Sequence, residues 1–221
     1  MNKLLNFRQT DTQKVYFISD PHFNHNPKWN VPLWKNRGFN SAIEMTDGII
    51  DSINATVDTN DILWMLGDFC LNTNESQFEE LLSRINCQNI YSLFGNHNSQ
   101  VERVYKNAVK EYADKLGIQE TIEIYPIKYR NLTFYGNYQE ITVDGQYMVL
   151  CHYPLYVFNY MKDGSIHLTG HSHGNCPLSQ PPNTTSKVLD VGWDLFKKPL
   201  SFSEVMDIMK TKNTLKVDHH A

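Results

Sequence analysis

Short apolar runs alternate with longer stretches of helical apolar spacing through the first half of the chain, and this alternation constrains the fold more than any other feature. The runs at 15–18, 62–66 and 89–94 predict buried strands. Between them, Ser41 with Glu44 and Asn74 with Gln77 have the spacing that begins helices. Strands that alternate with helices indicate βαβ units, whose strands are parallel.

The pattern changes to alternating, hairpin-like segments from about residue 119 onward. We expect strands at 121–125, 132–135, 141–143 and 146–150, and Asp144-Gly145 is a favourable two-residue hairpin turn. The chain has no internal repeat and no linker, which predicts one domain over residues 1–221. The fold class is therefore α/β, with one mixed sheet or two packed sheets.

The charge balance excludes a strongly basic polyelectrolyte binder. Lys and Arg total 20 against 24 Asp and Glu, for a formal net charge of −4. A protein that grips many phosphates normally needs a Lys or Arg for each, so no long nucleic acid is expected as a partner. No apolar run approaches the roughly 18 residues of a membrane helix, and the four cysteines are isolated. We expect a cytoplasmic protein with reduced thiols and no membrane partner; its oligomeric state stays open.

Polar residues that bind metals follow the expected strands. They are Asp20 and His22, Asp68, Asn96 and His97, His152, and His171 and His173. The carboxyl ends of strands in an open α/β sheet converge on one crevice, so these five segments can share a single site.

The donor set indicates which metals fit. Two carboxylates, one amide oxygen and four imidazoles suit Mn, Fe, Zn, Ni or Co rather than an all-oxygen calcium site. Seven ligands exceed the need of one tetrahedral ion, and they suit two ions about 3.5–4 Å apart that share a carboxylate. Asp68 lies in the middle of the set along the chain and is the candidate for that bridge.

Each motif also has an ordinary structural interpretation. Asp20 and Asp68 are common residue types at turns and helix caps, and His152 beside a cysteine suits a buried core histidine. The segment Gly170-His171-Ser172-His173 favours a metal even alone, because one turn brings both rings to the same place. The order of the motifs and their common place after strands favour the metal interpretation for all of them.

The series Asp-x-His, Gly-Asp, Gly-Asn-His, His and Gly-His-x-His, in this order over residues 20–173, resembles the calcineurin-like metallophosphoesterases. The stretch at 19–25 and the later Asp190-Val191-Gly192-Trp193-Asp194 look like the small single-domain phage and bacterial members. The resemblance implies a four-layer α/β/β/α sandwich of two mixed β-sheets flanked by helices.

The resemblance further implies a division of the ligands between two divalent ions. Asp20, His22 and His173 would hold one ion, Asn96, His152 and His171 the other, Asp68 would bridge them, and His97 would be the general acid. Two divalent ions outweigh two carboxylates, so the site would attract phosphate without a basic patch. Water shared by the ions can supply hydroxide for attack on phosphorus while His97 protonates the leaving oxygen.

The implied activity is hydrolysis of phosphate esters, with Mn²⁺ as the expected metal. Gly67-Asp68-Phe69-Cys70 lacks the Asp-Arg-Gly continuation of the protein Ser/Thr phosphatases, so a nucleotide or other small phosphodiester is the expected substrate. Two alternatives stay open: a non-catalytic metal-binding interaction module on the same fold, and a nuclease.

Residues in the loops beside the motifs are candidates for substrate contacts. Arg37 is a candidate phosphate clamp, although a solvated surface position is the more ordinary one for an arginine. Asn24 and His25 are candidates to line the cleft, and a surface position is an equally ordinary alternative. Aromatic side chains in the two long loops at 23–40 and 153–165 could stack a nucleobase, although packing in the core is the ordinary place for such residues. They are Trp29, Trp34, Tyr153, Tyr156 and Phe158.

Overall fold

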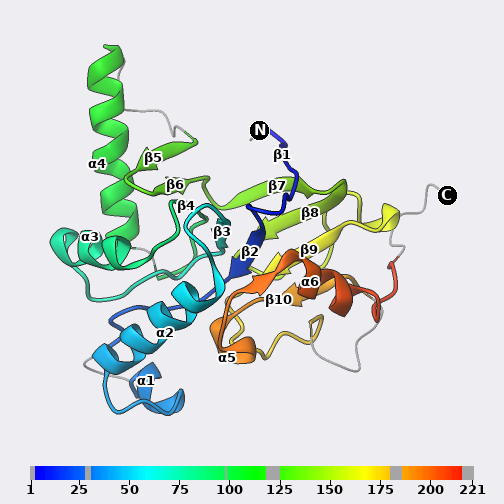
Figure 1. Ribbon diagram of the computed structural model, residues 1–221, viewed down its shortest axis with the longest axis horizontal. Coiled ribbons are helices and arrows are strands. Elements are labelled where there is room, and N and C mark those ends of the chain that lie inside the picture. The colour runs from blue at the N-terminus through cyan, green and yellow to red at the C-terminus, as the bar shows by residue number, and fades with distance from the viewer. Residues whose placement is uncertain (1–2, 28–30, 98, 118–124, 180–185, 216–221) are drawn as a thin grey trace.

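Two β-sheets with helices around them make up the fold (Figure 1). The computed structural model describes residues 3–27, 31–97, 99–117, 125–179 and 186–215. Within them, the first sheet has the order β11 (Leu200–Ser201), β2 (Val15–Ile18), β3 (Ile62–Met65), β4 (Asn89–Ser92), β6 (Leu132–Phe134) and β5 (Ile127–Tyr129). The second sheet has the order β1 (Leu5–Phe7), β7 (Tyr138–Val143), β8 (Gln146–Cys151), β9 (Ile166–Thr169) and β10 (Val188–Asp190). The helices are α1 (Leu33–Asn36), α2 (Ala42–Thr56), α3 (Glu75–Arg84), α4 (Ser99–Leu116), α5 (Trp193–Phe196), α6 (Phe202–Met209) and the 3₁₀ turn η1 (Met161–Asp163).

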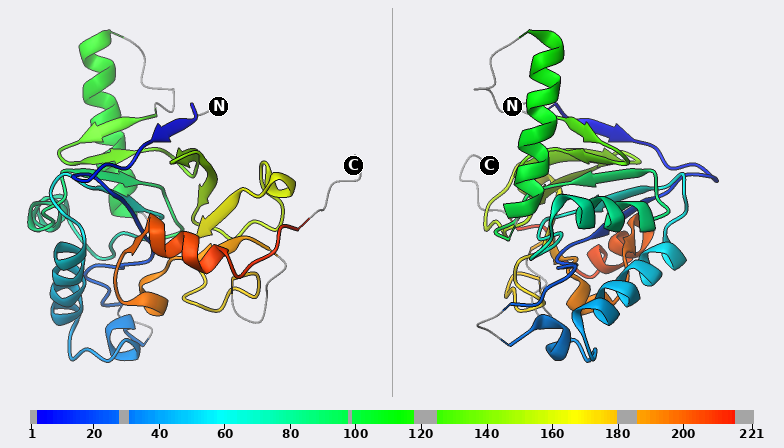
Figure 2. Two further views of the ribbon diagram at one scale, coloured as in Figure 1. Left: turned by 45° about the vertical axis from the view of Figure 1, so that its right-hand side comes forward. Right: turned by 90° about the vertical axis from the view of Figure 1, so that its left-hand side faces the viewer.

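The first sheet contains the predicted βαβ units. Strands β2, β3, β4 and β6 are parallel to one another, while β11 and β5 run antiparallel at the two edges. Every residue of β3 is buried, as a strand covered on both faces requires. Helices α2, α3 and α4 lie together on one side of the molecule (Figure 2), where their apolar residues pack with those of this sheet in one core.

The second sheet contains the predicted hairpin. Strands β7 and β8 are antiparallel, and the turn between them places Asp144 at φ 49° and Gly145 at φ 85°. Two successive left-handed residues are what a tight hairpin turn needs, which explains the Asp-Gly pair. Strands β8, β9 and β10 are parallel, and β1 adds in parallel beside β7. Residues 121–124 of the strand expected at 121–125 lie outside the described residues.

An apolar core fills the space between the sheets. It joins Trp64 and Leu66 from the first sheet's side to Leu150 and Leu168 from the second, and α6 adds Val205 to it. The outer face of the second sheet has a thinner cover than that of the first. There η1 and the loop before it place Phe158 and Met161 against Val149 and Val188. The expected α/β fold of two mixed sheets flanked by helices is confirmed.

Parallel strands of both sheets end at a shared edge. Beyond β2, the backbone nitrogen of Ser19 donates to the carbonyl of Val191, which follows β10, at 3.1 Å. This bond ties the end of a strand in the first sheet to the end of a strand in the second, so the loops that follow both sets of strands come together. All four cysteines are buried and free. Among the described residues, no helix combines the length and apolar character needed to cross a bilayer.

Candidate metal centre

The loops at the shared edge bring the predicted ligand side chains together. Asp20 and His22 follow β2, and Asp68 follows β3, in the first sheet. One carboxylate or ring atom from each of Asp20, His22 and His173 lies within 4.8 Å of the others, and the same holds for Asp20, Asp68 and His152. Asn96 contacts both His152 and His171. The structure therefore gathers all seven predicted ligands, while their role as ligands stays a prediction.

The first group, Asp20, His22 and His173, has donor atoms that the protein leaves unused. His22 is 2% exposed, and neither of its ring nitrogens has a hydrogen-bond partner; the same is true of Oδ1 of Asp20. Burial lowers the pKa of His22, which keeps its ring in the neutral form that ligates metals. Buried polar atoms without a partner are rare in native proteins. A divalent cation would satisfy these atoms, so the residues present fit the metal that the sequence predicts.

Burial and charge act in opposite directions on Asp20. Burial alone would raise the pKa of this carboxyl, but its contact with His22 and the neighbouring histidines outweigh burial and lower the pKa. Asp20 also accepts a hydrogen bond at Oδ2 from the backbone nitrogen of His171, at 3.0 Å. The carboxylate therefore stays ionised, as a metal ligand must be.

The second group consists of Asn96, His152 and His171. His152 is fully buried, and its Nδ1 donates to the carbonyl of Leu66 at 2.8 Å, which leaves the lone pair of Nε2 free to face the site. Oδ1 of Asn96 lies 3.0 Å from that Nε2 and 2.8 Å from Nδ1 of His171. Two ring nitrogens and an amide oxygen thus converge on one point, which is the arrangement of a nitrogen and oxygen site for a transition metal.

Asp68 lies between the two groups. Its Oδ2 is 3.5 Å from Nε2 of His22 and 3.6 Å from Nε2 of His152. Its Oδ1 accepts a hydrogen bond from the backbone nitrogen of His97 at 2.8 Å, which fixes the carboxylate. Asp68 is 1% exposed. A single buried oxygen therefore faces both groups, as a bridging ligand must.

Several of these residues have a backbone conformation that is unusual outside glycine. Asp20, His22, Asp68, His171 and His173 have φ between 48° and 67°, in the left-handed region. Each such residue costs about 1–3 kcal/mol, and such residues cluster at functional sites. The backbone around them is held by hydrogen bonds between neighbouring loops, such as His22 N to the carbonyl of Asp68 at 3.0 Å.

Three glycines of the motifs are required by close approach. A Cβ atom on Gly95 would stand well inside 3.0 Å of the Asp68 carboxylate, and one on Gly170 equally close to Ser19 and Asp20. Gly67 has φ 102°, and its Cβ would meet the His152 ring at 2.5 Å. At these positions the side chains of candidate ligands pack directly on the glycine backbone.

Asp190 supports the turn that carries His171 and His173, a role that the sequence did not reveal. This buried carboxylate accepts hydrogen bonds from the Ser172 hydroxyl and from the backbone nitrogen of Gly174, the latter at 3.0 Å. Its other oxygen accepts from the Gly192 nitrogen at 2.8 Å. The only sequence signal was the Asp190–Asp194 stretch itself, which gave a resemblance and no contact partner.

Arg37 differs from the expected phosphate clamp. Its side chain is 1% exposed and pairs with Asp194 through Nε at 2.9 Å and Nη2 at 2.7 Å. The same guanidinium donates to the carbonyls of Asp20 and Pro21. The buried guanidinium therefore has carboxylate and carbonyl acceptors within the protein, as a desolvated cation requires.

Two of the remaining candidates, His97 and His25, have their rings beside the ring of His22. His97 is exposed, and its ring centroid is 5.6 Å from that of His22. The half-buried ring of His25 meets His22 edge to face at 5.5 Å, and burial lowers the pKa of His25 to about 4. Asn24 is also half-buried, but its backbone nitrogen and side chain are bound to Thr46.

The aromatic candidates divide between core and surface. Trp34 packs against the core, and Phe158 is buried. Tyr153 and Tyr156 are 44% and 64% exposed, and the Tyr153 ring lies 4.9 Å from the ring of His171. Trp29 lies outside the described residues. Tyr153 is therefore the aromatic side chain that the structure places beside a candidate ligand.

Comparisons with known proteins agree with this architecture. A model of the calcineurin-like phosphoesterase family matches residues 13–175. The chain is 27% identical over 202 residues to an uncharacterized protein of Methanocaldococcus jannaschii, which covers 90% of this chain and 92% of that protein. The crystal structure of a protein of unknown function from Aquifex aeolicus has the same fold, with a TM-score of 0.60 at 20% identity over 89% of this chain and 100% of that one. Because the family model spans more than half of the chain and the ligand groups suit a metal, this protein belongs to the calcineurin-like phosphoesterases, a family that points to metal-dependent ester hydrolysis.

Proposed function

We propose that this protein is a dinuclear metal-dependent phosphodiesterase that acts on nucleotides or other small phosphodiesters. The observation that carries the proposal is the position of Asp68, whose Oδ2 lies 3.5 Å from His22 Nε2 and 3.6 Å from His152 Nε2. Two-metal phosphoesterases hold their ions about 3.5–4 Å apart. A carboxylate oxygen that faces both ligand groups can be shared between two such ions.

The ligands divide between the two groups described above. Asp20, His22 and His173 would hold one ion and Asn96, His152 and His171 the other, with Asp68 shared. When bound, divalent ions polarise a phosphoryl group and provide a nucleophile at neutral pH. Mn²⁺ is the expected ion, and Fe, Ni, Zn or Co suits the same donors.

His97 would act as the general acid. Its backbone nitrogen is held by Asp68 at 2.8 Å, while His97 itself is exposed and its ring centroid lies 5.6 Å from that of His22. A ring in that place can donate a proton to the departing oxygen of a substrate. His25 and Asn24, which are half-buried beside His22 and Thr46, are the proposed substrate contacts.

Two features support a small substrate. The formal net charge of −4 disfavours the binding of a long polyanion. The exposed ring of Tyr153, 4.9 Å from the His171 ring, offers a face on which a nucleobase can stack while its phosphate reaches the ligands. A nucleotide or a cyclic or linear dinucleotide combines both groups.

The test is hydrolysis of a substrate panel by the metal-loaded protein. The panel contains phosphomonoesters, cyclic and linear dinucleotides and nitrophenyl diesters, each assayed with Mn²⁺, Ni²⁺ and Zn²⁺. We expect diester turnover that Asp68→Asn reduces at least ~100-fold, in line with the loss of one catalytic group. Asp207→Asn is the matched control, because Asp207 is an exposed aspartate on α6 paired with Lys210, and it should retain full turnover.

Three results would overturn the proposal. Full turnover in Asp68→Asn would show that hydrolysis does not need Asp68 as a shared ligand. Tight metal binding without turnover of any ester would favour the non-catalytic interaction module. Salt-dependent affinity for long DNA, with cleavage of it, would favour a nuclease.

A further inference from the structure

Arg37, Asp194 and His173 form a continuous chain of contacts that ends at the first ligand group. The two oxygens of Asp194 accept from Nε and Nη2 of Arg37 at 2.9 and 2.7 Å. Oδ2 of Asp194 also lies 2.7 Å from Nδ1 of His173. These three residues come from the C-terminal end of α1, from α5 and from the turn after β9, and nothing in the ligand pattern of the sequence required them to meet.

Every donor of the Arg37 guanidinium is used within the protein. Besides the two bonds to Asp194, Nη2 donates to the carbonyl of Asp20 at 2.8 Å, and Nη1 donates to the carbonyl of Pro21 at 2.9 Å and contacts Sδ of Met45 at 3.8 Å. Five contacts match the five N–H groups of an arginine. The same guanidinium thus binds the backbone that carries Asp20 and, through Asp194, the ring of His173.

We propose that Arg37 and Asp194 are positioning residues that assemble the first ligand group, and that the affinity of this group for its ion depends on both residues. The inference rests on the proposed function, because it concerns the affinity of that two-metal centre. Asp194 binds Nδ1 of His173 and thereby leaves Nε2 as the free nitrogen of a ring that stacks 5.1 Å from the His22 ring. Substitution of a carboxylate that binds the second ring nitrogen of a ligating histidine typically lowers metal affinity about 10–100-fold.

Among the described residues, neither Arg37 nor Asp194 forms a hydrogen bond to a member of the second ligand group. His152 takes its orientation from the carbonyl of Leu66 at 2.8 Å. Its other contacts, to Asn96 and Asp68, lie within the centre itself. Removing Asp194 should therefore weaken one ion selectively, whereas a general loosening of the fold would weaken both.

The experiment measures Mn²⁺ stoichiometry and affinity by titration calorimetry and elemental analysis on metal-stripped protein. For Asp194→Asn we expect one ion to bind about 10–100-fold more weakly, with the affinity of the other unchanged. Arg37→Lys keeps a buried cation against Asp194 but lacks the fork, and we expect a smaller loss at the same ion. The matched controls are Asp47→Asn and Arg84→Lys, because Asp47 and Arg84 form an Arg–Asp pair of 2.6 Å that is partly exposed and away from the ligands.

A double-mutant cycle separates positioning from a structural role. In the His173→Ala background, Asp194→Asn should cause no further loss of Mn²⁺ affinity, since the ring it orients is gone. In the His152→Ala background, Asp194→Asn should still weaken the ion that remains. Equal losses in both backgrounds would show that Asp194 acts on the fold as a whole and would overturn the inference.

The outcomes also distinguish this inference from the proposed function. Wild-type protein that binds fewer than two ions would contradict the two-metal proposal itself. Two ions in the wild type with unchanged affinities in both Asp194→Asn and Arg37→Lys would refute the inference alone. Melting temperatures of all variants in EDTA identify any variant that does not fold, and Arg37→Lys then provides the decisive titration.

Discussion

His22 shows what a ligand position demands of the chain before any ion binds. It combines a left-handed backbone, at φ 50°, with a buried ring whose two nitrogens have no hydrogen-bond partner. The first feature disfavours the native state by about 1–3 kcal/mol, and the second by a similar amount. Both are explained if a ligand from outside the chain satisfies the ring.

His97 gives the sharpest prediction at the scale of a single residue. If its ring protonates the leaving oxygen, His97→Ala should slow hydrolysis of diesters with alkoxide leaving groups by about 10²–10⁴-fold. The nitrophenolate group of a nitrophenyl diester leaves as a stable anion and needs no proton, so the turnover of such diesters should change far less. Steady-state rates on a matched alkyl and nitrophenyl pair provide the measurement, and equal losses on both would discard the acid role.

Single residues also show where prediction from sequence stops. The ligand types and their placement after strands could be read from the sequence because chemistry and order are both local. The need for glycine at Gly95 could not, since it comes from the Asp68 carboxylate of a different loop packing on its backbone. The pairing of Arg37 with Asp194 could not be predicted either, because the two residues lie 157 positions apart in the sequence.

The elements that the sequence predicted best are those whose signals are local. The capping box of α3 is complete, with Asn74 accepting from the Gln77 nitrogen and the Gln77 side chain returning to Asn74. The cap of α2 is only half as predicted, because Glu44 bonds to the nitrogen of Asn40 instead of Ser41. Strands β5, β10 and β11 have two or three residues. Such short strands carry no measurable periodicity, and only the neighbouring strand defines them.

His167 on β9 gives a prediction at the scale of the element and its loop. The ring is fully buried; Nδ1 donates to the carbonyl of Val149 at 3.0 Å, and Nε2 accepts from the Leu155 nitrogen at 3.0 Å. Burial lowers the pKa of His167 below 6.5. In the unfolded chain the ring binds a proton near pH 6.5, whereas in the native state it does so only at lower pH. Stability from this group is therefore present above pH 6.5 and falls as pH falls toward the native pKa, by up to about 1.4 kcal/mol per pH unit.

The measurement is urea unfolding of wild type and His167→Gln in EDTA between pH 7.5 and 5. We expect His167→Gln to be less stable at pH 7.5 but to lose less stability as the pH falls, since glutamine does not titrate. Parallel stability curves for the two proteins would show that His167 titrates alike in both states.

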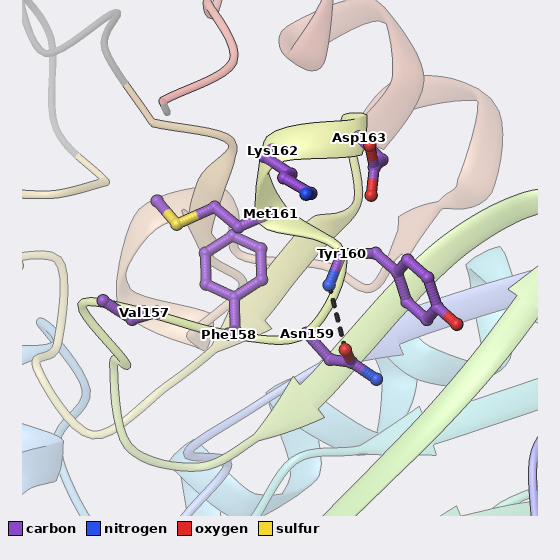
Figure 3. A pocket seen from close by; sticks show the side chains of 7 residues that line it. All are labelled: Val157, Phe158, Asn159, Tyr160, Met161, Lys162 and Asp163. Carbon is purple, nitrogen blue, oxygen red and sulfur yellow. Dashed lines mark hydrogen bonds between the residues drawn. The ribbon is translucent and has the colours of Figure 1, made fainter. Parts of the chain in front are cut away.

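At the scale of the whole molecule, the candidate centre joins the two sheets. Asp20, His22, Asp68 and Asn96 follow strands of the first sheet, while His152, His171 and His173 follow strands of the second. A hollow of about 480 Å³ lies at the loop after β8, where its lining among the described residues consists of residues 157–163 (Figure 3). None of the candidate ligands lines this hollow, so the hollow is separate from the candidate centre. The proposed ions, which both sheets would ligate, would link the sheets.

Metal removal should therefore destabilise the whole fold. An ion that binds only the native state adds about 2.7 kcal/mol when its free concentration is 100 times its Kd. We expect EDTA to lower the melting temperature of wild type by several degrees, consistent with about 2–4 °C per kcal/mol at this chain length. Asp68→Asn should show a much smaller shift. A wild-type melting temperature that is identical with Mn²⁺ and with EDTA would contradict the prediction.

The bond from the His171 nitrogen to Asp20 spans 151 positions, and this separation has a consequence for synthesis of the protein. On the ribosome, Asp20, His22, Asp68 and Asn96 are made long before His152, so a nascent fragment that ends before residue 152 lacks one member of the first ligand group and two members of the second. Contacts between residues this far apart carry a large entropy cost of loop closure and form slowly. The full set of candidate ligands therefore exists only once the chain through His173 has been made, and a shorter fragment could hold neither proposed ion with all of its ligands.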